Sequence, residues 1–171
     1  MKLLSMNERV ELNSKTTDFI LYLVDKMAIP TKTSIIKMCY LCDLAAINSG
    51  LDPITDFCYI RYYYGPFDKK IDDYLFNLVK NRKLNVETEY GSGGGEYEKY
   101  SIPVELKNDN DYSDFLSSDE IKVVEPILES LGSLNAKMLT EIAYKTKPMT
   151  SIGAKLGGIE HFAEKLNLSA S

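Results

Sequence analysis

A Cys-x-x-Cys pair, Cys39 and Cys42, is the first candidate for chemistry in this chain. Zinc sites and redox motifs use this spacing because two thiolates can share one metal ion or form one bond. Here both cysteines fall on the apolar face of an expected helix, and the sequence has no second pair. Since buried free cysteines behave as small hydrophobic residues, we expect both in the core, with no metal and no cofactor.

His161 is the only histidine and the second candidate. Histidine suits acid–base catalysis because it gains and loses a proton near neutral pH. No serine or cysteine in a recognisable nucleophile motif accompanies it, so we expect a surface or partly buried histidine on a helix. No catalytic residue emerges from the sequence, and we do not expect an enzyme.

The most distinctive segment is FCYIRYYYGPFDKKIDD, residues 57–73. Alternation along a strand separates two sets of side chains, Tyr59, Arg61 and Tyr63 on one face and Ile60, Tyr62 and Tyr64 on the other. Two interpretations have equal weight: the aromatics pack only in the core, or one set forms a partner-binding surface. Exposed aromatic patches usually mark contact sites, and tyrosine and arginine are enriched there. We therefore predict partner contacts by Arg61, Tyr62 and Tyr64.

The elements that position these residues can be predicted from periodicity, caps and breaks. Helices are expected over residues 15–29, 31–50, 69–80, 119–131, 135–144 and 151–168, and an extended segment over 57–64 that Gly65-Pro66 breaks. Asp68 suits a helix cap, Ser117 and Glu120 form a capping box, and Pro126 should kink or split its helix. Residues 85–104 predict a β-hairpin whose tip is glycine-rich. The fold class expected is mainly α-helical α+β: a helical bundle with a small β-hairpin and a winged-helix-like outline.

Bulk properties fit one intracellular domain spanning residues 1–171. Net charge is −5, which argues against a broad nucleic-acid footprint. An odd number of cysteines does not suggest a disulfide framework, and no window approaches a membrane-spanning length. We expect a reduced, cytoplasmic protein with no membrane partner.

A helix followed by a hairpin also raises the hypothesis of a winged-helix DNA-binding regulator. Basic residues that would touch phosphates flank the helix: Lys69, Lys70, Arg82 and Lys83. Acidic residues that would repel phosphates lie on the wing: Glu87, Glu89, Glu96 and Glu98. We keep DNA binding as the alternative function and do not expect nucleic acid as the main partner.

Residues 33–75 resemble the Panacea domain, also called the SocA-like antitoxin or phage-associated GepA-like family. The resemblance rests on three ordered motifs: Lys37, Tyr40, Leu41 and Asp43 in a helix, then Pro53, Ile54 and Thr55 in a loop, then Tyr64, Gly65 and Pro66 before the next helix. It is best over residues 31–80 and extends to about residue 145, with residues 150–171 as a helical C-terminal extension.

The resemblance implies a non-enzymatic antitoxin that binds and neutralises a cognate toxin encoded beside it. One branch of the family acts as a proteolytic adaptor that delivers its toxin to an AAA+ protease, so a protease is a second implied partner. Many members lie on phages or other mobile elements. The family brings no catalytic residues, in agreement with the lack of a recognisable catalytic motif in the sequence.

Overall fold

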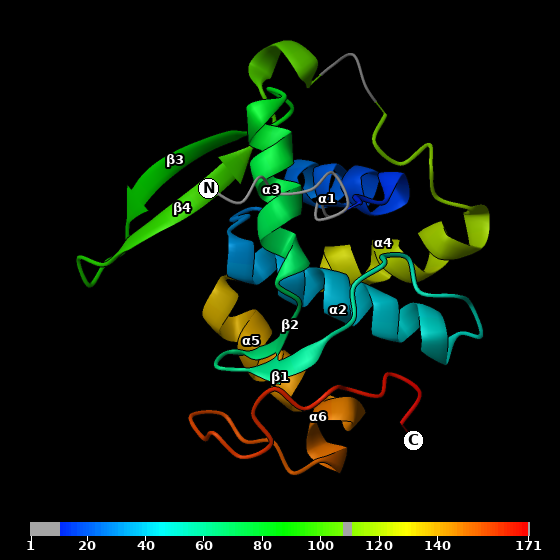
Figure 1. The fold of residues 1–171 in the computed structure, drawn as a ribbon. Helices are drawn as coiled ribbons and strands as arrows, with labels where there is room; N and C mark the ends of the chain where they lie inside the picture. Colours follow the sequence, from blue (N-terminus) through cyan, green and yellow to red (C-terminus); the bar gives the residue numbers. More distant parts are fainter. Residues whose placement is uncertain (1–10, 108–110, 171) are drawn as a thin grey trace, which may run out of the picture.

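The computed structural model describes residues 11–107 and 111–170 (Figure 1). Across these residues the helices are α1 (Ser14–Lys26), α2 (Lys32–Asn48), α3 (Lys70–Lys80), α4 (Ser118–Leu131), α5 (Ala136–Tyr144) and α6 (Lys147–Ser151), with a 3-10 turn η2 (Val104–Leu106). The strands are β1 (Ile60–Tyr62), β2 (Gly65–Phe67), β3 (Asn85–Tyr90) and β4 (Glu96–Ser101). The predicted mainly helical α+β class is confirmed.

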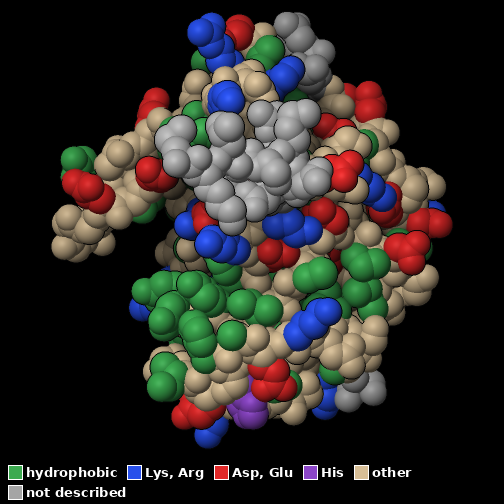
Figure 2. Space-filling view, viewed as in Figure 1, with side chains coloured by type: hydrophobic (Ala, Val, Ile, Leu, Met, Phe, Trp, Pro, Cys, Tyr) green, Lys and Arg blue, Asp and Glu red, His purple; other side chains and the backbone are tan. Residues whose placement is uncertain are grey.

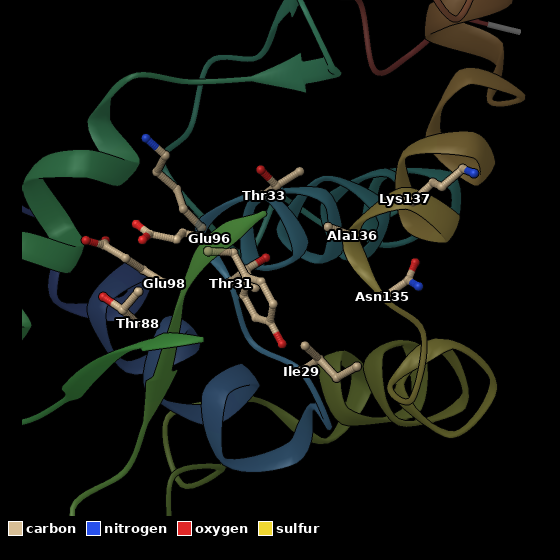
Figure 3. A pocket seen from close by; sticks show the side chains of 11 residues that line it. Ile29, Thr31, Thr33, Thr88, Glu96, Glu98, Asn135, Ala136 and Lys137 are labelled. Carbon is tan, nitrogen blue, oxygen red and sulfur yellow. The ribbon is translucent and has the colours of Figure 1, made fainter. Parts of the chain in front are cut away.

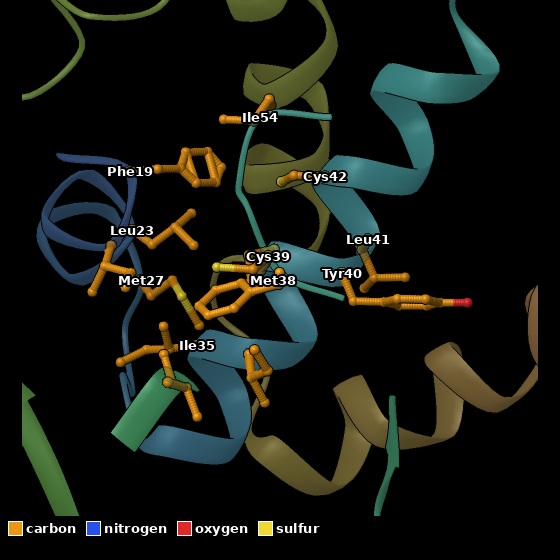
Figure 4. Close-up of a cluster of buried hydrophobic side chains, with 14 of the residues drawn as sticks. Phe19, Leu23, Met27, Ile35, Met38, Cys39, Tyr40, Leu41, Cys42 and Ile54 are labelled. Atoms are coloured by element: carbon orange, nitrogen blue, oxygen red, sulfur yellow. The ribbon is translucent and has the colours of Figure 1, made fainter. Parts of the chain in front are cut away.

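Helix α2 is the centre of the fold, because α1, α3, α4, α5 and β2 all pack against it. Its side chains are apolar on nearly every side, as expected of a helix that is surrounded by protein. Figure 4 shows the resulting core, where Met38 and Cys39 of α2 face Leu23 and Met27 of the α1 region. Thr31 and Ser34 form a reciprocal capping box that begins α2 after the break at Pro30.

The first strand pair corrects the expected role of Gly65-Pro66. These residues do not end the extended region but form β2, which pairs antiparallel with β1 in the register Ile60↔Phe67, Arg61↔Pro66 and Tyr62↔Gly65. Gly65 has φ +94, which lets the chain reverse directly after the turn. Asp68 follows β2 and its carboxylate accepts from the Lys70 amide at 2.9 Å, although α3 itself begins at Lys70.

The second strand pair is the predicted hairpin, formed by β3 and β4. Its tip is closed by two backbone hydrogen bonds between Gly91 and Gly95 and between Gly94 and Gly91. The hairpin extends away from the helices beside α3 (Figure 1), so the helix-then-hairpin order of the winged outline is present. At its base the Tyr100 amide donates to the Pro30 carbonyl at 2.8 Å.

The C-terminal half departs from prediction in two places. Pro126 lies inside α4 without splitting it, and the Ser117–Glu120 capping box that begins this helix is confirmed. After α5, Pro148 lies in the first turn of α6. The predicted helix over residues 151–168 is wrong: beyond Ser151 the chain forms turns and one isolated bridge between Ile60 and Lys165.

In the described part of the chain, no helix combines the length and apolar character needed to span a membrane.

Candidate interaction surface

Three buried polar side chains of α2 hold the surface elements in place. The Lys37 ammonium donates to the carbonyl of Pro66 in β2 at 2.8 Å, and Tyr40 shares a 2.7 Å hydrogen bond with the Thr146 hydroxyl. Burial lowers the pKa of Lys37 from 10.5 to about 7. The motif residues of this helix therefore tie the core to the β1–β2 hairpin and to the chain between α5 and α6.

Asp43 is the third of these side chains, and it organises the loop before β1. One carboxylate oxygen accepts the amides of Ile54 and Thr55 at 2.8 and 3.0 Å. The other accepts the hydroxyls of Thr55 and Tyr59 at 2.5 and 2.7 Å. Burial raises the pKa of Asp43, and the four hydrogen bonds oppose that rise. Of the remaining motif residues, Leu41, Gly65 and Pro66 are buried and Pro53 is exposed. These residues position the surface rather than form it.

An aromatic patch of four side chains lies on the outer side of the β1–β2 hairpin. We use this name for Tyr62, Tyr63, Phe67 and Phe162. Tyr62 stacks on Phe67 with ring centroids 4.8 Å apart, and Phe162 contacts Tyr62 at 5.3 Å and Tyr63 at 4.6 Å. Figure 2 shows hydrophobic side chains gathered over the region of this hairpin. Contiguous exposed apolar area of this kind marks interaction sites on soluble proteins.

Tyr64 extends this surface toward α5. Its side chain is 69% exposed and borders an apolar groove of about 360 Å³ that Leu156, Thr140 and Thr33 also line. The groove shares Thr33 and two α5 residues with a larger hollow of about 690 Å³ between β4 and the starts of α2 and α5. In Figure 3, Glu96 and Glu98 of the hairpin and Lys137 of α5 lie around this hollow.

Arg61 does not lie on the surface where it was expected. Its side chain is fully buried with that of Tyr59, because this face of β1 turns inward and the C-terminal residues cover it. Tyr63 was expected on the same face but is 58% exposed, since it follows the last residue of β1. The three predicted contact residues therefore separate: Tyr62 is half-buried in the aromatic patch, Tyr64 is exposed, and Arg61 lies beneath.

The candidates for chemistry remain apart from one another. Cys39 and Cys42 are fully buried on α2, which confirms the core interpretation, and burial raises the pKa of both thiols. His161 lies on an exposed turn rather than a helix, with Nδ1 2.6 Å from the Glu164 carboxylate. Among residues 11–107 and 111–170, no three His, Cys, Asp or Glu side chains are grouped to hold a metal ion.

One of the four basic residues of the DNA-binding alternative, Lys70, is paired with an acidic side chain. Lys70 forms an ion pair with Asp56 at 3.1 Å, and Asp72 and Asp73 lie in the first turn of α3. In the hairpin Glu87, Glu96 and Glu98 are exposed and Glu89 is half-buried. Nothing in this arrangement favours a phosphate-binding surface.

Phe162 and Phe67 are the surface residues that sequence reasoning missed. Phe162 lies about a hundred residues from the tyrosine run, in a segment whose periodicity suggested a helix. Phe67 directly follows Gly65-Pro66, which looked like the end of the extended region. Recognising Gly65 as a hairpin turn rather than a break would have found Phe67.

Comparison with known proteins places the middle of the chain in a described family. The family model for the antitoxin SocA-like, Panacea domain matches residues 35–148, from the first turn of α2 into α6. This range holds all of the motif residues and both hairpins, and it ends before the segment that carries Phe162. No curated protein and no solved structure shows a significant match to the chain.

Proposed function

The chain belongs to the family of SocA-like antitoxins with a Panacea domain, and we propose that it binds and neutralises a cognate toxin protein. The family match over residues 35–148 carries this proposal. We propose that the protein acts without catalysing a reaction.

We propose that the toxin contacts Tyr64 and the hairpin side chains of the aromatic patch, Tyr62, Tyr63 and Phe67. Aromatic side chains contribute large contact areas at the centre of interfaces, and Tyr64 borders an apolar groove that could accept a partner side chain. Tyr62, Tyr63 and Phe67 carry no charge, so the patch itself has no group that could form an ion pair with the toxin. Contact by burial of apolar area is therefore the expected mode.

Co-expression with the neighbouring open reading frame tests the function. We expect that reading frame to arrest growth when expressed alone, and its product to co-purify with this chain when both are expressed. A product that is harmless alone and does not co-purify would remove the basis of the proposal.

Tyrosine substitutions test the surface. Tyr64→Ala should weaken toxin binding by at least about tenfold, as truncation of a central interface aromatic does. Tyr90→Ala is the matched control, because Tyr90 is 68% exposed but lies at the end of β3, away from the patch. If both variants lose the same toxin affinity, or if neither variant loses any, the interface lies elsewhere.

Neutralisation can follow two routes, and toxin lifetime separates them. If the chain only covers the toxin, the bound toxin should persist in cells. If it also serves as an adaptor for an AAA+ protease, toxin lifetime should shorten on co-expression and recover in a strain that lacks the protease. Both routes require that the chain bind the toxin, which the family match supports. We propose delivery to an AAA+ protease as the second route.

A further inference from the structure

The outer edge of β1 is already occupied by another part of the same chain. We propose that this edge and Arg61 form a docking site for an extended, acidic segment of the partner toxin, and that the C-terminal segment, residues 152–168, fills the site until the toxin displaces it. This inference rests on the proposed antitoxin function and adds the location and the chemistry of the contact.

The C-terminal segment pairs with β1 as an additional strand would. The Arg61 amide donates to the Glu164 carbonyl at 2.8 Å, the Ala163 amide donates to the Arg61 carbonyl at 2.7 Å, and the Leu166 amide donates to the Tyr59 carbonyl at 3.0 Å. In Figure 1 the segment runs alongside β1 below the hairpin. Since β2 covers the opposite edge of β1, the C-terminal segment covers the only edge that a further strand could join.

The pairing is irregular, which makes the segment a poor strand. His161 and Ala163 both have left-handed backbone conformations, with φ of +62 and +64, which strain the backbone of a non-glycine residue. An extended segment of another chain could form the same hydrogen bonds without this strain. The edge is therefore better matched to a regular strand than to its present occupant.

Few apolar side chains hold the C-terminal segment down. Ala154 and Leu166 are buried and Ile152 and Leu168 pack partly against the core, whereas the other three large apolar side chains stay exposed: Leu156 at 55%, Ile159 at 73% and Phe162 at 41%. Segments with little buried apolar area open at low free energy. The segment also lies beyond residue 148, where the family match ends, so it covers the shared domain from outside.

Arg61 indicates the chemistry of the displaced ligand. Its guanidinium is fully buried and donates to three neutral carbonyl oxygens, those of Tyr62, Lys155 at 3.1 Å and Gly158 at 2.5 Å. Its Nε has no hydrogen-bond partner within the described residues, and no carboxylate of those residues lies within ion-pair distance.

A buried cation without a counterion is costly, and a guanidinium with an unused N–H donor can bind a carboxylate. A carboxylate can take two parallel hydrogen bonds from Nε and one terminal nitrogen, which neutral carbonyls do not provide. The face of the guanidinium rests on the Tyr144 ring, 5.4 Å from its centroid, so the arginine is already oriented. An aspartate or glutamate on the incoming strand would complete the site.

A disulfide lock across the two paired strands tests the displacement. Ile60 and Lys165 face each other as a non-hydrogen-bonded antiparallel pair, the closer of the two pair types, which suits a cross-strand disulfide. The variant is full-length I60C/K165C in a C58S background, because Cys58 is the exposed native cysteine. We expect the oxidised protein to bind the co-expressed toxin at least about tenfold more weakly, and reductant to restore binding.

The controls separate this inference from the proposed function. C58S alone and I60C/C58S should bind like the wild type with and without reductant. If the wild-type chain does not bind the adjacent product, the proposed function fails; if it binds and the oxidised lock binds equally well, only the displacement model fails. If the lock instead abolishes self-association of the protein, the occupant is a second copy and the toxin assignment is wrong.

Amide hydrogen exchange directly tests whether a toxin strand replaces the C-terminal segment. On toxin binding the Arg61 amide should stay protected, because one strand replaces another, whereas the amides of Ala163 and Leu166 should lose protection. Replacing the acidic residues of the newly protected toxin segment by their amides should weaken binding at least about tenfold. Unchanged protection of Ala163 and Leu166, or full tolerance of the amide replacements, would contradict the model.

Discussion

The Nζ atom of Lys37, at the centre of α2, lies 2.8 Å from the carbonyl oxygen of Pro66 in β2. The lysine is 1% exposed and buried among apolar neighbours, so its charge is costly at neutral pH. The same contact joins the core helix to the hairpin that carries the aromatic patch. Stability and the shape of the interaction surface therefore depend on one buried group.

The first prediction concerns the pH dependence that Lys37 imposes. Its pKa is about 7 in the folded protein and 10.5 ordinarily, so between these values the unfolded chain binds more protons and stability rises with pH. From about pH 7 to about pH 9 this contributes about 2 kcal/mol to the free energy of unfolding. Lys37→Met should lack that gain in urea unfolding measured across this range. The exposed Lys83→Met is the control, and its pH profile should run parallel to the wild type; a parallel profile for Lys37→Met would contradict the prediction.

The second prediction concerns the four hydrogen bonds to Asp43. Asp43→Ala leaves buried donors of Ile54, Thr55 and Tyr59 without an acceptor and should reduce the free energy of unfolding by about 3 kcal/mol or more. Tyr59→Phe removes one donor together with its need for a partner and should cost about 1 kcal/mol. Chemical denaturation ranks the variants, and a loss under about 1 kcal/mol for Asp43→Ala would show that the network contributes little.

The third prediction separates backbone strain from packing at Gly65. Alanine at Gly65 would meet a φ of +94 and place its methyl carbon 3.3 Å from the Tyr144 ring. Gly50 is a matched control, with φ +81 and no atom within 4 Å of the added carbon. Both substitutions should destabilise, and Gly65→Ala by about 1 kcal/mol more, because only it also overpacks. Equal losses in thermal or urea unfolding would show that the ring moves aside freely.

The fourth prediction concerns the thiols. Only Cys58 is exposed, and burial raises the pKa of Cys39 and Cys42, so neither provides a thiolate near neutral pH. A thiol reagent should modify one cysteine per chain under native conditions and all three in denaturant. Cys58→Ser should abolish the native reaction. Stoichiometric zinc in the purified protein, or rapid modification of Cys39, would overturn the core interpretation.

Local rules predicted the parts of the fold that local interactions decide. The capping box at Ser117 and Glu120 and the glycine-rich hairpin tip were both predicted from side chains within a few residues. The helix expected over residues 151–168 failed because its periodic apolar residues serve separate contacts: Leu166 is buried near β1, while Phe162 packs on Tyr62. Pro126 did not split α4, a result that propensity alone does not anticipate.

The sequence by itself determined the mainly helical class, the central apolar helix and the motifs that point to the antitoxin family, because periodicity and short spacings are local properties. Tertiary structure decided which of the tyrosine-run residues reach the surface. Alternation along β1 separates Arg61 from Tyr62 but does not say which side faces inward, since that depends on what covers each face. The C-terminal segment covers Arg61, and only the folded chain brings residues a hundred positions apart into that contact.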